Sequence, residues 1–297
     1  MARLHPVLAV LVAANLSSVQ AASPATGMPV IGVVEAHGAF RLDHATVSGN
    51  ATLFEGAIIE TAAGTSSEEL RSGARVTLAP ESRGRFFGDH VVLERGQGRL
   101  DRATGYFFEA RGLTIQPETG ASTGRITLDA ATGVQVAALT GSLRVLNAQR
   151  MVVAKVLPGA ALAFSPQAGG GATRLTGHLV SKGGHYLLTD ETTNVTVEIT
   201  GAGLKKLEGQ RVEVSGYSDP AATPVSDATQ VIRATTISKL PGGTAAAGAG
   251  GTAAGGGVSG LAISATTVAI IGGVAAAAVV GGLAATGTLS GGSTVSR

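Results

Sequence analysis

The chain has 297 residues, of which 44 are glycine and none is cysteine or tryptophan, and its net charge is +2. Without cysteine it has no disulfide framework, no thiolate metal site and no cysteine nucleophile. A surplus of two positive charges is too small to indicate nucleic-acid binding. Because 44% of the residues are hydrophobic and 14% are charged, we expect a folded chain rather than a disordered one.

Residues 1–21 have the pattern of a secretory signal peptide. Arg3 supplies the positive start, residues 7–16 (VLAVLVAANL) form an apolar core, and the small residues Val19 and Ala21 precede the expected cleavage site. The alternative is a buried N-terminal helix, since the apolar run is too short to cross a bilayer. We expect residues 1–21 to direct export and to be removed after Ala21.

Residues 29–166 consist of short runs in which apolar and polar residues alternate, separated by Gly, Pro, Asn and Asp. Such spacing predicts an all-β sandwich or β-roll, and no window has a convincing helical period. The expected strands cover residues 30–35, 39–42, 57–61, 75–78, 91–94, 106–110, 113–116, 125–129, 134–139, 142–147, 151–157 and 160–164.

Several weak motifs follow one another in this region in a recognisable order. They are residues 54–61 (FEGAIIET), 69–82 (ELRSGARVTLAPES), 91–96 (VVLERG), 139–145 (LTGSLRV) and 156–162 (VLPGAAL). Together they resemble the FecR-like domain of bacterial envelope proteins, which implies an extracytoplasmic β module over residues 29–166. One departure is Ser72-Gly73-Ala74, where that family usually has Asp-Gly-Ser.

The best-known relatives in that family relay a signal to a cytoplasmic sigma factor through one membrane helix. In those proteins a cytoplasmic segment precedes the helix, whereas this chain begins with the expected signal peptide. The resemblance therefore implies the β module and does not carry the signalling role over to this chain.

After a linker at residues 167–172, residues 172–240 contain a second series of strands. The expected strands are residues 174–181, 185–190, 195–200, 211–217 and 230–240, which predicts a small five-stranded OB-like barrel. The pattern resembles a recurrent bacterial secreted OB-like module. The matching positions specify strand faces and turns rather than a ligand; they are Gly177, Leu179, Gly184, Tyr186, Leu188, Asp190, Leu204, Gly209, Val212, Val214 and Gly216.

The C-terminal part has a different composition from the rest. Residues 241–257 read as a flexible Gly/Ala/Thr linker, and residues 262–284 carry no charge. A helix over 262–284 would be about 34 Å long, enough to cross a hydrocarbon core of about 30 Å. Gly273, Ala277 and Gly281 would form a small-residue face on which two such helices pack. The alternative is a low-complexity tail that does not cross the membrane.

No catalytic, metal or cofactor site is expected. His37 and His44 with Asp43, or His178 and His185 with Asp190, would at most make a weak metal site, and exposed polar side chains are the simpler interpretation. No nucleophile elbow, zinc-protease motif or phosphate loop is present, so we expect no enzyme. The barrel residues that could bind nucleic acid are too few to predict it; they are Tyr186, Tyr217, Lys205, Lys206 and Arg211.

We therefore expect a non-enzymatic bacterial cell-envelope protein that presents two extracytoplasmic β modules for binding or scaffolding. Its place would be the periplasmic side of the inner membrane, anchored by the C-terminal helix, which would also allow self-association. The expected partner is an envelope protein or polysaccharide. Two alternatives stay open: a sensory FecR-like protein acting through a membrane partner, and a secreted carbohydrate-binding protein, although few aromatic rings are available to stack on sugars.

Overall fold

A computed structural model describes residues 28–129, 133–166, 173–225, 227–241 and 268–279. The expectation of an all-β fold is confirmed over these residues, which form 23 strands and one short 3-10 helix, η1 (Leu204–Leu207). The expected signal peptide and most of the expected Gly/Ala-rich linker lie outside the described residues.

The first sixteen strands form a module of two hydrogen-bonded sheets. One sheet has the order β4 (Ala51–Phe54), β1 (Val30–His37), β6 (Thr65–Leu70), β7 (Arg75–Leu78), β9 (His90–Asp101), β12 (Thr123–Asp129), β13 (Gly133–Thr140) and β16 (Ala161–Pro166). The other has the order β3 (Ala45–Val47), β2 (Phe40–Leu42), β5 (Ile58–Thr61), β8 (Arg83–Phe86), β9, β10 (Phe107–Ala110), β11 (Leu113–Pro117), β14 (Leu143–Leu146) and β15 (Val152–Val156).

Strand β9 belongs to both sheets. Its first half pairs with β8 and β10, and its second half pairs with β7 and β12. The change of sheet occurs near Gly96, which has a φ of 80°. A Cβ at this position would lie 2.7 Å from Ser82 Cα, so the close approach of the two chain segments requires glycine. Period-2 alternation along the strands then buries one face of each sheet in a shared core.

The expected five-stranded barrel is confirmed. It consists of β17 (Thr173–Lys182), β18 (His185–Asp190), β19 (Thr196–Thr200), β20 (Arg211–Ser218) and β21 (Val231–Lys239). Pairing runs from β17 to β18, β19, β21, β20 and back to β17, so the sheet is closed. The β19–β21 pair is parallel, and η1 fills the connection between β19 and β20.

The structure corrects the expected C-terminal helix over the residues that it describes. Residues 268–278 form two strands, β22 (Val268–Ile271) and β23 (Val274–Ala278), joined by Gly272 and Gly273. Both glycines have positive φ, 55° and 76°, as a two-residue hairpin turn requires. Within the described ranges, none of the helical structure has the length and apolarity that a membrane span needs. The other residues of 262–284, apart from Val279, lie outside them.

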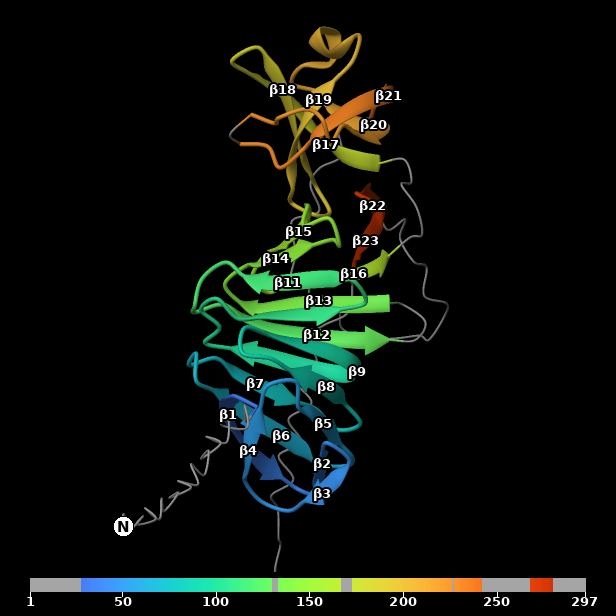
Figure 1. Ribbon diagram of the computed structural model, residues 1–297. Helices are drawn as coiled ribbons and strands as arrows, with labels where there is room; N and C mark the ends of the chain where they lie inside the picture. Colours follow the sequence, from blue (N-terminus) through green and yellow to red (C-terminus); the bar gives the residue numbers. More distant parts are fainter. Residues whose placement is uncertain (1–27, 130–132, 167–172, 226, 242–267, 280–297) are drawn as a thin grey trace, which may run out of the picture.

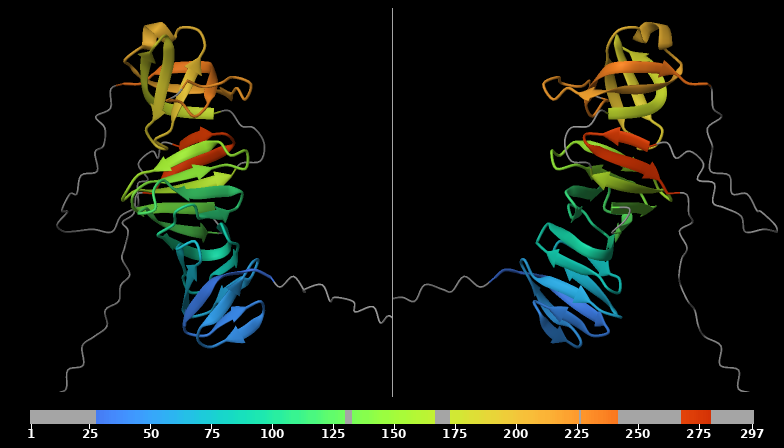
Figure 2. Two further views of the ribbon diagram at one scale, coloured as in Figure 1. Left: turned by 60° about the vertical axis from the view of Figure 1, so that its left-hand side comes forward. Right: turned by 90° about the vertical axis from the view of Figure 1, so that its right-hand side faces the viewer.

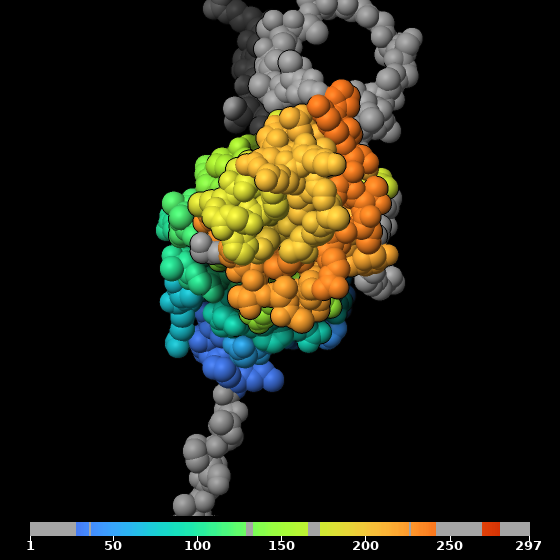
Figure 3. Space-filling view, turned by 90° about the horizontal axis from the view of Figure 1, so that it is seen from above, coloured from blue at the N-terminus to red at the C-terminus, as the bar shows by residue number. Residues whose placement is uncertain are grey.

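The hairpin extends the first module toward the barrel (Figures 1 and 2). Strand β23 pairs antiparallel with β16, and β22 meets β17 where Arg174 pairs with Ile270. Seen from the barrel end, the barrel covers the end of the first module (Figure 3). The backbone N–H of Lys155 donates to Thr193 O at 2.7 Å, which joins β15 directly to the barrel.

Candidate functional site

An open groove of about 1060 Å³ lies on the first module, where β2, β3, β5, β9 and β12 approach one another. Side chains of both charges line it beside apolar ones. The lining residues are Ala39, Phe40, Arg41, Thr46, Glu60, Thr61, Ala62, Ala63, Ala79, Pro80, Glu81, Arg95, Gly96, Gln97, Thr127 and Leu128, and we call this surface the Arg/Glu groove.

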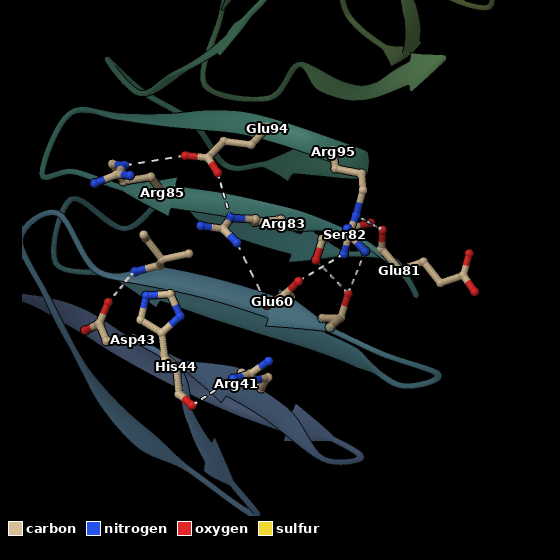
Figure 4. A network of polar contacts seen from close by, with 12 residues as sticks. Arg41, Asp43, His44, Glu60, Glu81, Ser82, Arg83, Arg85, Glu94 and Arg95 are labelled. Carbon is tan, nitrogen blue, oxygen red and sulfur yellow. Dashed lines mark hydrogen bonds and ion pairs between the residues drawn. The ribbon is translucent and has the colours of Figure 1, made fainter. Parts of the chain in front are cut away.

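Glu60 is at the centre of the polar network beside this groove (Figure 4). Its Oε1 accepts from Arg95 Nη2 at 3.1 Å, and its Oε2 lies 4.0 Å from Arg83 Nη1. Arg83 Nε in turn contacts Glu94 Oε2 at 2.7 Å. The Glu60 side chain is 23% exposed and that of Arg95 is 60% exposed. The carboxylate is therefore held in place, while its arginine partner still faces solvent.

Buried hydroxyl groups fix the turn that forms one rim of the groove. Thr61 Oγ1 donates to Ala79 O at 2.6 Å and accepts from the Ser82 backbone N–H at 2.9 Å. Ser82 Oγ accepts from the Gln97 backbone N–H at 2.9 Å. Between these anchors Glu81 has a φ of 57° and is exposed. The rim is thus preorganised, since its donors and acceptors are already satisfied within the fold.

The groove presents two kinds of binding group to solvent, charged side chains and a strand edge. Exposed Arg41 and Glu81 lie on its walls with Arg95, so groups of either sign find a partner there. Strand β3, which carries Thr46, pairs with β2, and no other described strand pairs with it. A free strand edge offers backbone N–H and C=O groups to a peptide that adds as a further strand.

Two of the residues expected to pack membrane helices together, Gly273 and Ala277, lie in the C-terminal hairpin and not in the Arg/Glu groove. Gly273 is in the turn of the β22–β23 hairpin, and Ala277 is on β23 opposite Ala163 of β16. Gly281 lies outside the described residues. Over the described part of the segment these small residues permit sheet pairing rather than a helix–helix contact.

The histidines singled out from the sequence do not come together as a metal site. His185 Nδ1 lies 2.7 Å from Glu198 Oε1, and His37 and His44 are exposed at the ends of other strands. Hydrogen bonding to His185 holds the pKa of Glu198 below its usual value. The described ranges contain no group of three His, Asp or Glu side chains placed to hold a metal ion.

Asp190 has a structural position in the barrel. It is fully buried, and its Oδ1 accepts from the Thr176 N–H at 2.8 Å. Its Oδ2 accepts from the N–H and the hydroxyl of Thr193, both at 2.8 Å, and from the Thr192 N–H at 3.2 Å. Burial raises the pKa of Asp190 in spite of these bonds. Its oxygens are thus committed to the turn after β18.

The barrel residues considered for nucleic-acid binding have different positions and contacts in the fold. Arg211 makes a two-pronged ion pair with Glu191, with contacts of 2.9 and 2.8 Å, and Tyr186 packs against the core. Lys205 and Lys206 lie on η1, whereas Tyr217 is 55% exposed on β20.

The residues of the Arg/Glu groove are not predictable from the sequence, because they come from strands far apart in the chain. Alternation along β5 leaves Glu60 off the core, but in β9 the alternation that buries Val91 and Leu93 breaks where the strand changes sheet, so it does not predict the position of Arg95. Neither pattern indicates that Glu60 and Arg95 face each other. His90 was also missed; it stacks between Phe87 and Phe107, with ring centroids 4.4 and 5.2 Å apart. Comparison of the chain with protein families, curated proteins and solved structures gives no match.

Proposed function

We propose that the protein is a non-enzymatic bacterial cell-envelope protein that binds a partner protein through the Arg/Glu groove. The observation that carries this proposal is an open groove of about 1060 Å³ lined by Arg41, Glu60, Glu81 and Arg95 beside a free strand edge. Charges of both signs in fixed positions favour a specific complementary surface over non-specific attraction. The β modules then act as a rigid support for this surface.

The FecR-like resemblance of residues 29–166 supports the proposed location. The motif at 54–61 covers the end of β4, a turn and β5, and the motif at 69–82 contains β7. We propose on this basis, and on the expected signal peptide, that the protein acts on the periplasmic side of the inner membrane.

Photo-crosslinking at Thr46 tests the groove. A photoreactive amino acid at this exposed β3 position should give a defined adduct in cells, and the same residue at exposed Thr236 on the barrel should not. We expect Arg95→Glu to abolish the adduct at Thr46, because it reverses the charge that faces solvent.

A charge-swapped variant separates binding from folding. Glu60→Arg combined with Arg95→Glu rebuilds this ion pair with the opposite polarity, so the groove presents the wrong charges. Because Glu60 also lies 4.0 Å from Arg83, thermal unfolding is measured beside the adduct to show that the variant keeps its fold. We expect no adduct from it. Restoration of the adduct would show that the pair acts only through stability, and an unchanged adduct in Arg95→Glu would contradict the proposal.

Membrane attachment is tested separately. Residues 268–278 cannot pair with β16 and cross a bilayer as a helix at the same time. For the docked hairpin we expect the mature protein to leave membranes in alkaline carbonate. Retention in the membrane would support the anchor through residues 262–284, with the hairpin undocked.

A further inference from the structure

A second cavity lies where the first module, the barrel and the C-terminal hairpin meet. It has a volume of about 730 Å³, within the usual range of ligand sites, and such sites are frequent between structural units. Its walls come from the β10–β11 turn, the β14–β15 turn, strand β20 with the loop that follows it, and the hairpin turn. We call it the junction pocket.

The fold brings these walls together through specific contacts. Thr114 of β11 pairs with Leu146 of β14, so the turns that precede and follow these residues lie at the same end of the sheet. Asn147 is 3% exposed and donates from Nδ2 to Gly272 O at 3.0 Å, which holds the hairpin turn against the pocket. The pocket is therefore a built feature of the assembled molecule rather than a gap between loops.

Three side chains on the walls have uncommitted binding groups. Arg111 and Gln149 are exposed, Tyr217 is 55% exposed, and none of these side chains has a hydrogen bond or ion pair within the described ranges. The Arg/Glu groove is different, since Arg95 is already paired with Glu60. In the wall beside Tyr217, the buried Gln230 Nε2 also lacks a partner among the described residues.

These groups match the chemistry of one ligand class. A free guanidinium binds a carboxylate through two parallel hydrogen bonds, an exposed tyrosine ring stacks on an apolar face, and amides bond hydroxyl groups. A sugar acid combines all three features. A peptide is a poorer match, because β11 and β20 are each paired on both sides and leave no free edge for a peptide main chain.

We propose that the junction pocket binds an acidic saccharide, with its carboxylate on Arg111 and its ring on Tyr217. This site is separate from the Arg/Glu groove, so the two proposals stand or fall independently. The hairpin turn is part of the wall, and we therefore expect the ligand to stabilise the docked hairpin.

Calorimetric titration with a galacturonic acid trisaccharide, compared with a neutral glucose trisaccharide of the same length, tests the proposal. We expect the acidic sugar to bind at least about tenfold more tightly, and the difference to shrink as salt is added. Arg111→Gln should remove the preference for the acidic sugar, and Tyr217→Ala should weaken the binding of both sugars about tenfold.

Arg150→Gln is the matched control. Like Arg111, Arg150 is exposed and has positive φ, and it is in the turn after β14, but it does not line the pocket. Its replacement, like Arg95→Gln in the groove, should leave the affinity unchanged. Equal affinity for the two sugars, or an undiminished preference in Arg111→Gln, would overturn the proposal. Tighter binding of an acidic tripeptide than of the acidic trisaccharide would show that the pocket binds a peptide and would overturn the proposal.

Discussion

Glu68 is a carboxyl group without a partner in the core of the first module. It lies on β6, and neither of its oxygens nor the hydroxyl of Ser66 has a hydrogen-bond partner among the described residues. Burial raises its pKa from 4.5 to about 8, and the nearby Tyr106 is buried as well. The neutral acid is therefore the form that the fold accepts at mildly acidic pH.

We predict that the free energy of unfolding falls as the pH rises between 4.5 and 8. Below pH 4.5 Glu68 is protonated in both the folded and the unfolded chain. Above that pH it ionises in the unfolded chain but stays protonated in the folded chain, which stabilises the unfolded state. At about 1.4 kcal/mol per pH unit the loss is roughly 5 kcal/mol over this window. Glu68→Gln should flatten the dependence in urea unfolding at pH 5 and 8.

Glu69→Gln is the control for this prediction, because Glu69 is the exposed neighbour that pairs with Arg75. It should leave the pH dependence as in the wild type. The same pH dependence in Glu68→Gln as in the wild type would show that Glu68 ionises as readily in the folded chain as in the unfolded chain.

Asp190 offers a second prediction at this scale. Asp190→Ala leaves three backbone donors and the Thr193 hydroxyl without their acceptor inside the barrel. We expect a loss of about 3 kcal/mol or more in denaturant unfolding. Asp227→Ala, which removes an exposed ion pair with Lys182, should cost less than about 1 kcal/mol. Similar losses in both variants would show that the hydrogen bonds of Asp190 do not stabilise the barrel.

Single strands were well predicted where one face is apolar. The alternation of residues 75–78 and 185–190 gave the bounds of β7 and β18, because burial of every second side chain is a local property of the sequence. Strand β6 (TSSEEL) escaped, since its inward residues include Ser66 and Glu68. A polar run signals a strand only when its neighbours β1 and β7 are known.

The C-terminal segment shows how composition misled the prediction of an element. Absence of charge suggested a membrane helix, yet Gly272 and Gly273 between β-branched residues form a hairpin turn. Ile271, Val274 and Ala276 are buried against the core. The apolar character of the hairpin is thus explained by docking on β16, a contact between residues more than a hundred positions apart.

An engineered disulfide tests this docking. Ala163 of β16 and Ala277 of β23 are directly opposite each other and half-buried. The natural chain has no cysteine that could compete with an engineered pair. Ala163→Cys with Ala277→Cys should form an intramolecular bond on mild oxidation, visible as a faster-migrating monomer in non-reducing electrophoresis. A covalent dimer, or no bond at all, would contradict pairing within one chain.

The register control combines Ala163→Cys with Ala275→Cys. Ala275 lies on the same face of β23 but is opposite Ser165, two residues away from the engineered cysteine. Diagonal positions are too far apart for an unstrained disulfide. Efficient bonding of this pair would show that the hairpin slides along β16.

The candidate sites could not be predicted, because they arise when the whole molecule assembles. The Arg/Glu groove joins β2, β3, β5, β9 and β12, and the junction pocket joins turns of the first module, the barrel and the hairpin. Tyr217 stood out in the sequence only as a nucleic-acid candidate that was not adopted, and nothing in the sequence pointed to Arg111 or Gln149, because their position at the pocket depends on the packing of distant turns. Local patterns locate strands, whereas a pocket needs the pairing order of the sheets.

At the scale of the whole molecule the hairpin joins the first module to the barrel. Its β23 extends the sheet of the first module, and its β22 reaches β17 of the barrel. We predict that truncation after Leu240 uncouples the modules, giving two transitions in scanning calorimetry where the full chain gives one. Loss of the buried Ile271 and Val274 should lower the melting temperature of the first module by about 5 °C or more. Truncation after Val279 keeps the hairpin, so this variant should unfold as the full chain does. A single unchanged transition after truncation at Leu240 would show that the modules are coupled without the hairpin, through contacts such as that of Lys155 with Thr193.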